Sequence, residues 1–233
     1  MSTTAVAING SPRRERGYTA LVLDALLEGM ANAGCESEVH HTSALELKPC
    51  SCGVMHCWYK KPGECCVQDD MQSLYPRLRE ADTLVFATPV YIPLPGAMQT
   101  FINRLCPLAR PYLEFRDGRT RARLREDVQI QRIALVAVGA WWEIENTATV
   151  VRIAEDFTAN CSVPFAGSVL RPHAFKMKEE GELTPDGEAV LAAVRQAGRE
   201  LAHDGAMQPE TLAAIRRPLV AEEELRAWYN QYA

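Results

Sequence analysis

The sequence predicts an α/β protein with a doubly wound sheet of five parallel strands and helices on both faces. Two observations support this class. Short β-rich runs alternate with amphipathic helical patterns along the chain, which is the order expected for parallel strands joined by right-handed crossovers. The chain also has 233 residues, 47% of them hydrophobic, which is enough for one large domain with a sizeable core.

The first part of the chain predicts three strands and three helices. Residues 3–9 (TTAVAIN) are a candidate buried strand, and the helix that follows has apolar residues at helical spacing and ends near Gly34. Residues 36–42 form a weaker second strand. Residues 69–81 form a helix whose acidic first turn suits the helix dipole. The strongly apolar residues 82–91 form the third strand, which a helix over residues 96–105 follows.

The second part continues the same alternation. Residues 132–139 are the fourth strand, residues 146–160 a helix and residues 164–170 the fifth strand. A long helix over residues 185–205 has a proline at its start, as is common at the first helical position. We therefore expect one nucleotide-binding domain over residues 1–205 and a helical C-terminal extension over residues 206–233.

Two segments lie outside this alternation. The first is an insertion over residues 48–71, after the second strand, with five of the eight cysteines of the chain. The second is an arginine-rich arm over residues 106–128. Charged runs usually face water, so the arm is interpreted as a solvated hairpin or a subunit-contact arm. The alternative is that its arginines meet a nucleotide phosphate.

Composition narrows the possible partners. The net charge of −5 does not suggest binding to nucleic acid or to an acidic membrane surface. No apolar run approaches the roughly 18 residues that span a bilayer, and the N-terminus lacks the basic start of a signal peptide. We therefore expect a cytoplasmic protein, where clustered cysteines more often indicate metal or redox chemistry than structural disulfides.

The loop after the first predicted strand, residues 9–19 (NGSPRRERGYT), has the features of an anion site. Gly10 allows a sharp turn, Ser11 and Thr19 offer hydroxyl groups, and the next helix presents its N-terminus. The chain contains neither Gly-Lys-Ser/Thr nor Gly-x-Gly-x-x-Gly, so this is neither a Walker loop nor a dinucleotide fingerprint. A terminal phosphate monoester fits such a loop, although a plain turn between strand and helix has the same composition.

A second motif follows the third strand. Residues 87–104 (ATPVYIPLPGAMQTFINR) leave the strand through Pro-Val-Tyr and a loop rich in proline and glycine, which suits a flat heterocycle. Together, "NGSPR…GYT" and "TPVY…PG…FINR" resemble the NADPH-dependent FMN reductase family and the related iron–sulfur flavoproteins. The likeness covers residues 3 to about 140 and implies a flavodoxin-like fold.

The resemblance also implies a set of FMN-binding residues. The phosphate would be surrounded by Ser11, Arg13, Tyr18 and Thr19, and the isoalloxazine ring would face Pro89, Val90, Tyr91 and Ile92. A third flavin-contacting loop would contain Gly139, Ala140, Trp141 and Trp142. Tyr18 departs from the family, in which asparagine is usual. For the two tryptophans, burial against the last helix is an equal alternative.

The relatives carry a cysteine motif in the same place as the insertion, and a compact version of it binds a [4Fe–4S] cluster. The chain keeps the frame of the motif, but Val54 replaces one cysteine and Cys52 is extra. The resemblance implies Cys50, Cys52, Cys57 and Cys65 as conditional cluster ligands, with Cys66 as a spare. Zinc on the same thiols and a loop of reduced thiols remain as alternatives. The other cysteines are predicted to be packing residues, and His173 is predicted to lie at the surface.

The function implied by the resemblance is that of an FMN-dependent oxidoreductase that transfers hydride or electrons from NAD(P)H to a small molecule. The chemistry takes place on N5 of the flavin, so no catalytic side chain is predicted. The resemblance also implies a homo-oligomer, a dimer or tetramer, with FMN near the subunit interface. Two alternatives remain: a flavin protein, with or without an iron–sulfur cluster, that carries electrons, and a flavin-free regulatory or binding module.

Overall fold

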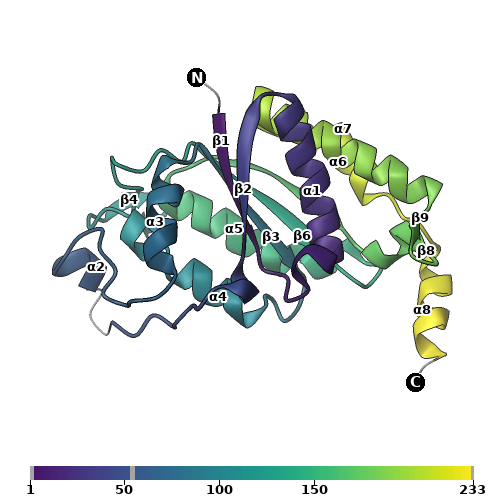
Figure 1. Cartoon of the computed structure of the whole chain (residues 1–233), viewed down its shortest axis with the longest axis horizontal. Helices are drawn as coiled ribbons and strands as arrows, with labels where there is room; N and C mark the ends of the chain where they lie inside the picture. The colour runs from purple at the N-terminus through teal and green to yellow at the C-terminus, as the bar shows by residue number, and fades with distance from the viewer. Residues whose placement is uncertain (1–2, 53–55, 232–233) are drawn as a thin grey trace.

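The computed structural model describes residues 3–52 and 56–231, and a parallel five-stranded sheet forms its centre (Figure 1). The strands are β1 (Thr3–Asn9), β2 (Cys35–His41), β3 (Thr83–Pro89), β6 (Arg132–Val138) and β7 (Phe165–Arg171). Their order across the sheet, β2-β1-β3-β6-β7, is the doubly wound order of flavodoxin-like proteins. All four strand pairs are parallel. The predicted fold class is therefore confirmed.

One face of the sheet is covered by α1 (Tyr18–Asn32), α6 (Pro185–His203) and α7 (Pro209–Arg216). Two glycines allow α1 and α6 to cross closely. A Cβ atom on Gly29 would lie 1.9 Å from the carbonyl oxygen of Arg195, and one on Gly198 would lie 2.0 Å from that of Leu26. Any side chain at either position would force the two backbones apart.

The other face is covered by α3 (Met71–Glu80), α4 (Gly96–Asn103) and α5 (Ala148–Cys161). The two faces have separate cores because side chains alternate along each strand. In β1, Ala5 and Ala7 pack with α1 and α6, whereas Val6 and Ile8 pack with the residues of α3 and α4. Both cores bury mainly aliphatic side chains, as expected for a parallel sheet covered on both sides.

Shorter elements lie at the edges. Beside the sheet lie α2 (His56–Tyr59), the hairpin of β4 (Glu114–Arg116) and β5 (Arg119–Arg121), the hairpin of β8 (Lys178–Glu179) and β9 (Glu182–Leu183), and α8 (Glu222–Asn230). Figure 1 shows α2 and β4 on the side of α3, and α8 below β8 and β9 at the opposite side. Within the described ranges, no helix combines the length and the apolar character needed to cross a membrane.

The arginine-rich arm forms a hairpin, as the first interpretation predicts. Each of its arginines has a carboxylate partner within 4.0 Å. The pairs are Arg110–Glu126, Arg116–Glu114, Arg119–Asp156, Arg121–Asp117, Arg123–Glu114 and Arg125–Asp127. The guanidinium of Arg116 also donates to the carbonyl oxygen of Ala159 at the end of α5 (3.0 Å). Five carboxylates, four from the arm and Asp156 from α5, thus pair with the six arginines, and the arm is held to α5.

Candidate functional site

The loops that follow β1, β3 and β6 meet at the carboxyl edge of the sheet, where the chain direction around the sheet reverses. A cavity of about 270 Å³ opens there. In open α/β sheets, ligands bind at this kind of crevice. The lining residues, which come from all three loops and from the segment after β7, are Ser11, Arg13, Gly17, Tyr18, Thr19, Pro89, Val90, Tyr91, Val138, Gly139, Ala140, Ala174 and Phe175.

The loop after β1 can take only glycine at two positions. A Cβ atom on Gly10 would lie 2.8 Å from the Cβ of Met98, and one on Gly17 would lie 2.9 Å from the Oγ of Ser11. The amide of Gly10 donates to the carbonyl oxygen of Ala87 in β3 (2.7 Å), which holds the start of the loop against the neighbouring strand. The backbone at the floor of the cavity is therefore closely packed, and the space above it is kept open.

The first helix presents an uncapped N-terminus to this cavity. Gly17 precedes α1 without a side-chain cap, and the first turn contains no acidic residue. The free N–H groups and the helix dipole at such a terminus favour an anion. Ser11 and Thr19 are almost fully buried at this point, and the Oγ of Ser11 accepts a hydrogen bond from the amide of Arg13 (3.2 Å).

Asn9, at the end of β1, gives a test of whether the site fits a ligand. Its side-chain oxygen accepts a hydrogen bond from the amide of Ser11 (2.9 Å). Its side-chain nitrogen is buried, and within the described part of the chain it has no hydrogen-bond partner. An unpaired buried donor costs about 1–3 kcal/mol. A ligand with acceptor oxygens in this loop would remove that cost, so the donor set fits a phosphorylated cofactor such as FMN.

A second cavity, of about 310 Å³, adjoins the first and shares Val90, Tyr91, Gly139 and Ala140 with it. Ile92 and Trp141 also line it, and both side chains are largely exposed, as is Tyr91. Contiguous exposed apolar side chains at the mouth of a cleft are typical of a site that a ligand or a second protein covers. The first cavity thus contains the anion-binding start of α1, and the second has exposed apolar side chains at its mouth beside the polar Glu143, Asn146 and Thr147.

The structure brings most of the predicted site residues together. Nine of them line the first cavity, namely Ser11, Arg13, Tyr18, Thr19, Pro89, Val90, Tyr91, Gly139 and Ala140, while Ile92 and Trp141 line the second. The hydroxyl of Tyr18 donates to the carbonyl oxygen of Phe175 (3.5 Å). Trp142 lines neither cavity, and its Nε1 donates to the carbonyl oxygen of Val220 (3.0 Å). Its side chain is half-buried beside the C-terminal extension.

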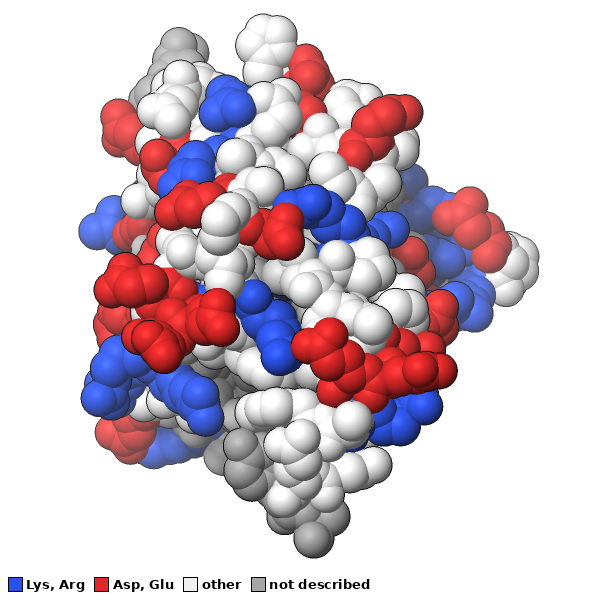
Figure 2. All heavy atoms as spheres, turned by 90° about the vertical axis from the view of Figure 1, so that its right-hand side faces the viewer, with Lys and Arg blue, Asp and Glu red and all other residues white. Residues whose placement is uncertain are grey.

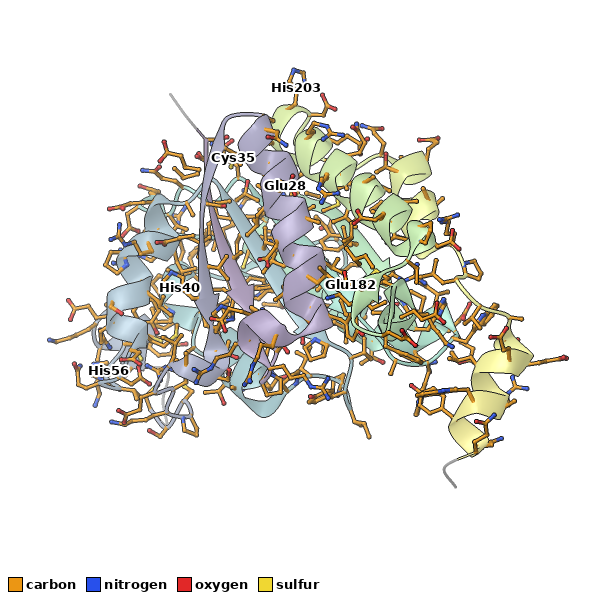
Figure 3. The ribbon with its side chains drawn as sticks, turned by 45° about the vertical axis from the view of Figure 1, so that its right-hand side comes forward. Glu28, Cys35, His40, His56, Glu182 and His203 are labelled. Carbon is orange, nitrogen blue, oxygen red and sulfur yellow. The ribbon has the colours of Figure 1, made fainter. Side chains whose placement is uncertain are left out.

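Two further residues that were not predicted, Ala174 and Phe175, follow β7 and line the first cavity. A signal was present: the carboxyl ends of parallel strands meet at one edge of a sheet, so residues just past the fifth predicted strand belong near the site. The histidines form no shared site. Figure 3 shows His40 on β2, His56 in the cysteine insertion and His203 at the far end of α6, well separated from one another.

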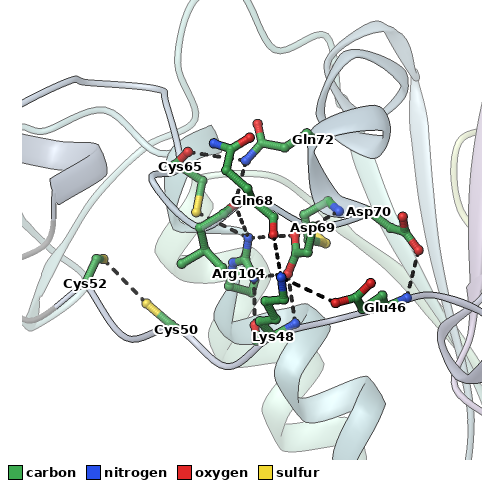
Figure 4. A network of polar contacts seen from close by, with 12 residues as sticks. Glu46, Lys48, Cys50, Cys52, Cys65, Gln68, Asp69, Asp70, Gln72 and Arg104 are labelled. Atoms are coloured by element: carbon green, nitrogen blue, oxygen red, sulfur yellow. Dashed lines mark hydrogen bonds and ion pairs between the residues drawn. The ribbon is translucent and has the colours of Figure 1, made fainter.

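The cysteine insertion is anchored by a buried ion pair (Figure 4). Arg104, at the end of α4, and Asp69, just before α3, both have fully buried side chains that are 2.5 Å apart. Arg104 also donates to the carbonyl oxygen of Lys48 (2.6 Å) and to the sulfur of Cys65 (3.3 Å). Burial opposes ionisation of Asp69, but hydrogen bonds from Arg104 and two backbone amides outweigh it and lower its pKa.

The conditional cluster ligands lie near one another but are not arranged as a metal site. The sulfurs of Cys50 and Cys52 are 3.7 Å apart, whereas Cys57 is buried beside Cys106, and Cys65 contacts Arg104. Burial, followed by the neighbouring thiol of Cys106, raises the pKa of the Cys57 thiol. Among the described residues, no three His, Cys, Asp or Glu side chains could hold a metal ion together.

Val54, the position of the missing family cysteine, lies outside the described residues. The part of the insertion that the structure describes contains no preformed metal site, and the ligand set remains a prediction. Cys106 is a packing residue, as predicted: it packs against the small cluster that contains Cys57 and Trp58, and its carbonyl oxygen accepts a hydrogen bond from Trp58 (3.3 Å).

His173 contradicts its prediction as a surface residue, because it is only 1% exposed. Its Nε2 accepts hydrogen bonds from the guanidinium of Arg171 (2.8 Å) and from the amide of Leu219 (3.1 Å). Arg171 is also fully buried and donates to the carbonyl oxygens of Ile215 (2.7 Å) and Arg217 (2.9 Å). These carbonyls belong to the end of α7, where a cation is favourable. The pair thus holds the chain that leads from α7 to α8.

This pair predicts a pH dependence of stability. Burial, followed by the charge of Arg171, lowers the pKa of His173 to about 4 from 6.5. The unfolded chain then binds a proton that the native protein excludes, so the free energy of unfolding falls as the pH drops from 6.5 to 4. A shift of this size corresponds to a loss on the order of 3 kcal/mol. Urea unfolding at several pH values should show this slope. It should be reduced in His173→Gln, and an unchanged slope in that variant would contradict the assignment.

Comparison with known proteins agrees with this architecture. A sheet in the order 2-1-3-4-5 with an anion-binding loop after its first strand defines the class of flavodoxin-like flavoproteins. Residues 3–141 match the model of the NADPH-dependent FMN reductase family. The chain belongs to that family. The predicted family is thereby confirmed.

Two curated relatives are both named iron–sulfur flavoproteins. One, from Archaeoglobus fulgidus, is 39% identical over 117 residues, which are 49% of this chain and 51% of the relative. The other, from Methanocaldococcus jannaschii, is 34% identical over 106 residues, 46% of this chain and 51% of the relative. The chain thus spans about half the length of the curated relatives it matches.

Solved structures share the fold at low identity. An NAD(P)H:quinone oxidoreductase from Methanothermobacter marburgensis superposes with a TM-score of 0.60 at 17% identity, covering 87% of this chain and 98% of that one. An FMN-dependent NADH-azoreductase from Bacillus anthracis, solved with FMN, gives 0.58 at 13% identity, covering 86% and 100%. At these identities the likeness supports the fold alone.

Proposed function

We propose that the chain binds one FMN across the two adjoining cavities and uses NAD(P)H to reduce a small-molecule acceptor. The observation that carries this proposal is the cavity at the uncapped start of α1, which Ser11 and Thr19 line and which adjoins a second cavity with exposed apolar side chains. The unpaired amide of Asn9, at the start of the same loop, supports it. Bound FMN supplies the redox chemistry, because it accepts a hydride from a nicotinamide and passes electrons on.

In this proposal the residues of the chain bind and orient. Ser11, Thr19 and the amides at the start of α1 hold the phosphate, with Arg13 at the rim. Pro89, Val90, Tyr91 and Ile92 form one wall for the ring, and Gly139, Ala140 and Trp141 the other. The backbone amides of Val90 and Tyr91 already have partners in the protein, since they donate to the carbonyl oxygens of Val138 (2.9 Å) and Pro93 (2.9 Å). The ring is therefore held mainly by apolar contact.

We also propose a homo-oligomer, a dimer or tetramer, in which a second subunit covers the exposed Tyr91 and Ile92 beside the flavin. Residues 1–205 would form the FMN-binding domain and residues 206–233 its helical extension. A cytoplasmic location is supported by eight cysteines without a disulfide among them. Electron transfer between proteins is the second candidate function, which the similarity to proteins named iron–sulfur flavoproteins favours.

The purified protein should be yellow and carry about one FMN per chain, because the polar and apolar cavities adjoin at the switch point of the sheet. The measurement is the absorption spectrum of the native protein, followed by release and quantification of the flavin. Addition of NADPH without oxygen should bleach the flavin bands, and a quinone should restore them. A colourless protein that also fails to take up added FMN would refute the proposed function.

A further inference from the structure

The C-terminal helix α8 builds a third cavity next to the proposed flavin site. This cavity, which we call the α8 pocket, has a volume of about 350 Å³ and is lined by Trp141, Trp142, Glu143, Glu222, Leu225, Arg226 and Tyr229. It shares Trp141 and Glu143 with the apolar cavity that the flavin ring would occupy. Helix α8 lies outside residues 3–141, the part that matches the family, so this pocket is a feature of the chain beyond that match.

Several contacts hold α8 in this place. The hydroxyl of Tyr229 donates to the carbonyl oxygen of Ala140 (3.3 Å), and Leu225 is buried. The ring of Tyr229 also packs edge-on against Phe175, with ring centroids 6.0 Å apart. Because Ala140 and Phe175 both line the first cavity, α8 is connected directly to the walls of the flavin site.

The lining of the α8 pocket indicates the chemistry of its ligand. Trp141, Trp142 and Tyr229 provide aromatic surface, on which planar rings stack favourably. The charged lining residues are two glutamates and one arginine, which leaves one negative charge. Arg226 is already paired with Glu222, so Glu143 is the uncompensated group. Figure 2, which faces the side of the molecule that carries α8, shows no broad basic area that would attract an anion.

We infer that the α8 pocket binds the electron acceptor, a planar aromatic molecule of about two fused rings that is neutral or cationic. This inference rests on the proposed function, because it places the acceptor beside the ring end of the flavin site. Trp141 forms the boundary between the two cavities, so it would contact both the flavin and the acceptor. An anionic aromatic is disfavoured by Glu143, whose carboxylate accepts a hydrogen bond from the side chain of Asn146 (3.2 Å).

Calorimetric titration of the oxidised, FMN-loaded protein without NADPH tests the inference. The probe is 2,3-dimethyl-1,4-naphthoquinone, whose substituted ring carbons do not alkylate the free cysteines. Tyr229→Ala should weaken its binding roughly tenfold, because one aromatic wall is lost. Glu224→Ala is the matched control, since Glu224 is exposed on the same helix and does not line the pocket. Tyr229→Phe keeps the ring and should retain most of the affinity.

A second experiment tests the charge of the pocket and does not depend on Tyr229. Anthraquinone-2-sulfonate should bind the native protein more weakly than the neutral probe, and Glu143→Gln should narrow that difference. Equal affinity of the neutral probe for native protein and a folded Tyr229→Ala variant would overturn the inference. So would displacement of the probe by FMN, which would place it in the flavin cavity. If the protein binds no FMN but binds the probe in a Tyr229-dependent way, the proposed function fails while the α8 pocket stands.

Discussion

Replacing Ser11 and Thr19 together with alanine is expected to weaken FMN binding by about 10²–10⁴-fold while riboflavin binding changes little. Both hydroxyls are buried at the uncapped start of α1, where the phosphate is proposed to lie. A hydrogen bond to a charged group contributes about 1.5–3 kcal/mol, so the loss of two amounts to about 3–6 kcal/mol. Each 1.4 kcal/mol is about tenfold in affinity. Riboflavin lacks the phosphate, so its affinity should stay nearly the same.

The measurement is quenching of flavin fluorescence on titration with the apoprotein, with both ligands on the same preparation. Ser73→Ala is the control, because Ser73 is exposed on α3 and its hydroxyl donates to the carbonyl oxygen of Asp70 (2.8 Å), away from the cavity. This variant should bind both ligands as the native protein does. If the double variant lost affinity for FMN and riboflavin equally, the two hydroxyls would not belong to a phosphate site.

The second large effect is on stability. Arg104→Ala should lower the free energy of unfolding by about 3–5 kcal/mol, because it leaves a buried carboxylate without its partner. Asp69 would keep its bonds from the amides of Lys48 (2.8 Å) and Met71 (3.1 Å) but lose both bonds from the guanidinium. The carbonyl of Lys48 would also lose a donor, so the start of the cysteine insertion should loosen together with the ion pair.

Urea unfolding measures this difference, and Arg110→Ala is the matched control. Arg110 pairs with Glu126 at the surface (3.6 Å), where such a bridge contributes at most about 1 kcal/mol. The native ion pair should also weaken in acid. The pKa of Asp69 is lowered from 3.8, so its contribution is fully present above pH 4 and disappears as the pH falls through the lowered value. If Arg104→Ala and Arg110→Ala both lowered the free energy of unfolding by a similar small amount, the buried pair would not anchor the insertion.

The local pattern of the sequence determined the secondary structure of this protein and the position of its two main motifs. Runs of apolar residues and helical spacing predicted all five sheet strands and the longer helices between them, but not the short α2, with shifts of a few residues at their ends. The motifs around Ser11 and Tyr91 follow the first and third strands. Because parallel strands end at one edge, their order along the chain already placed both loops beside one cavity. Such features depend on neighbours a few residues apart, which is why they can be read from the chain.

Only the tertiary structure decided which distant side chains meet. Arg104 belongs to the motif "FINR", yet its guanidinium anchors the cysteine insertion 35 residues earlier, through Asp69. Cys57 faces Cys106, and His173 is buried because Arg171 holds the end of α7 above it. The wall that α8 adds depends on contacts such as Tyr229 with Ala140, 89 residues apart. These partners have no periodicity or spacing that marks them, since their proximity arises only when the layers of the fold pack together.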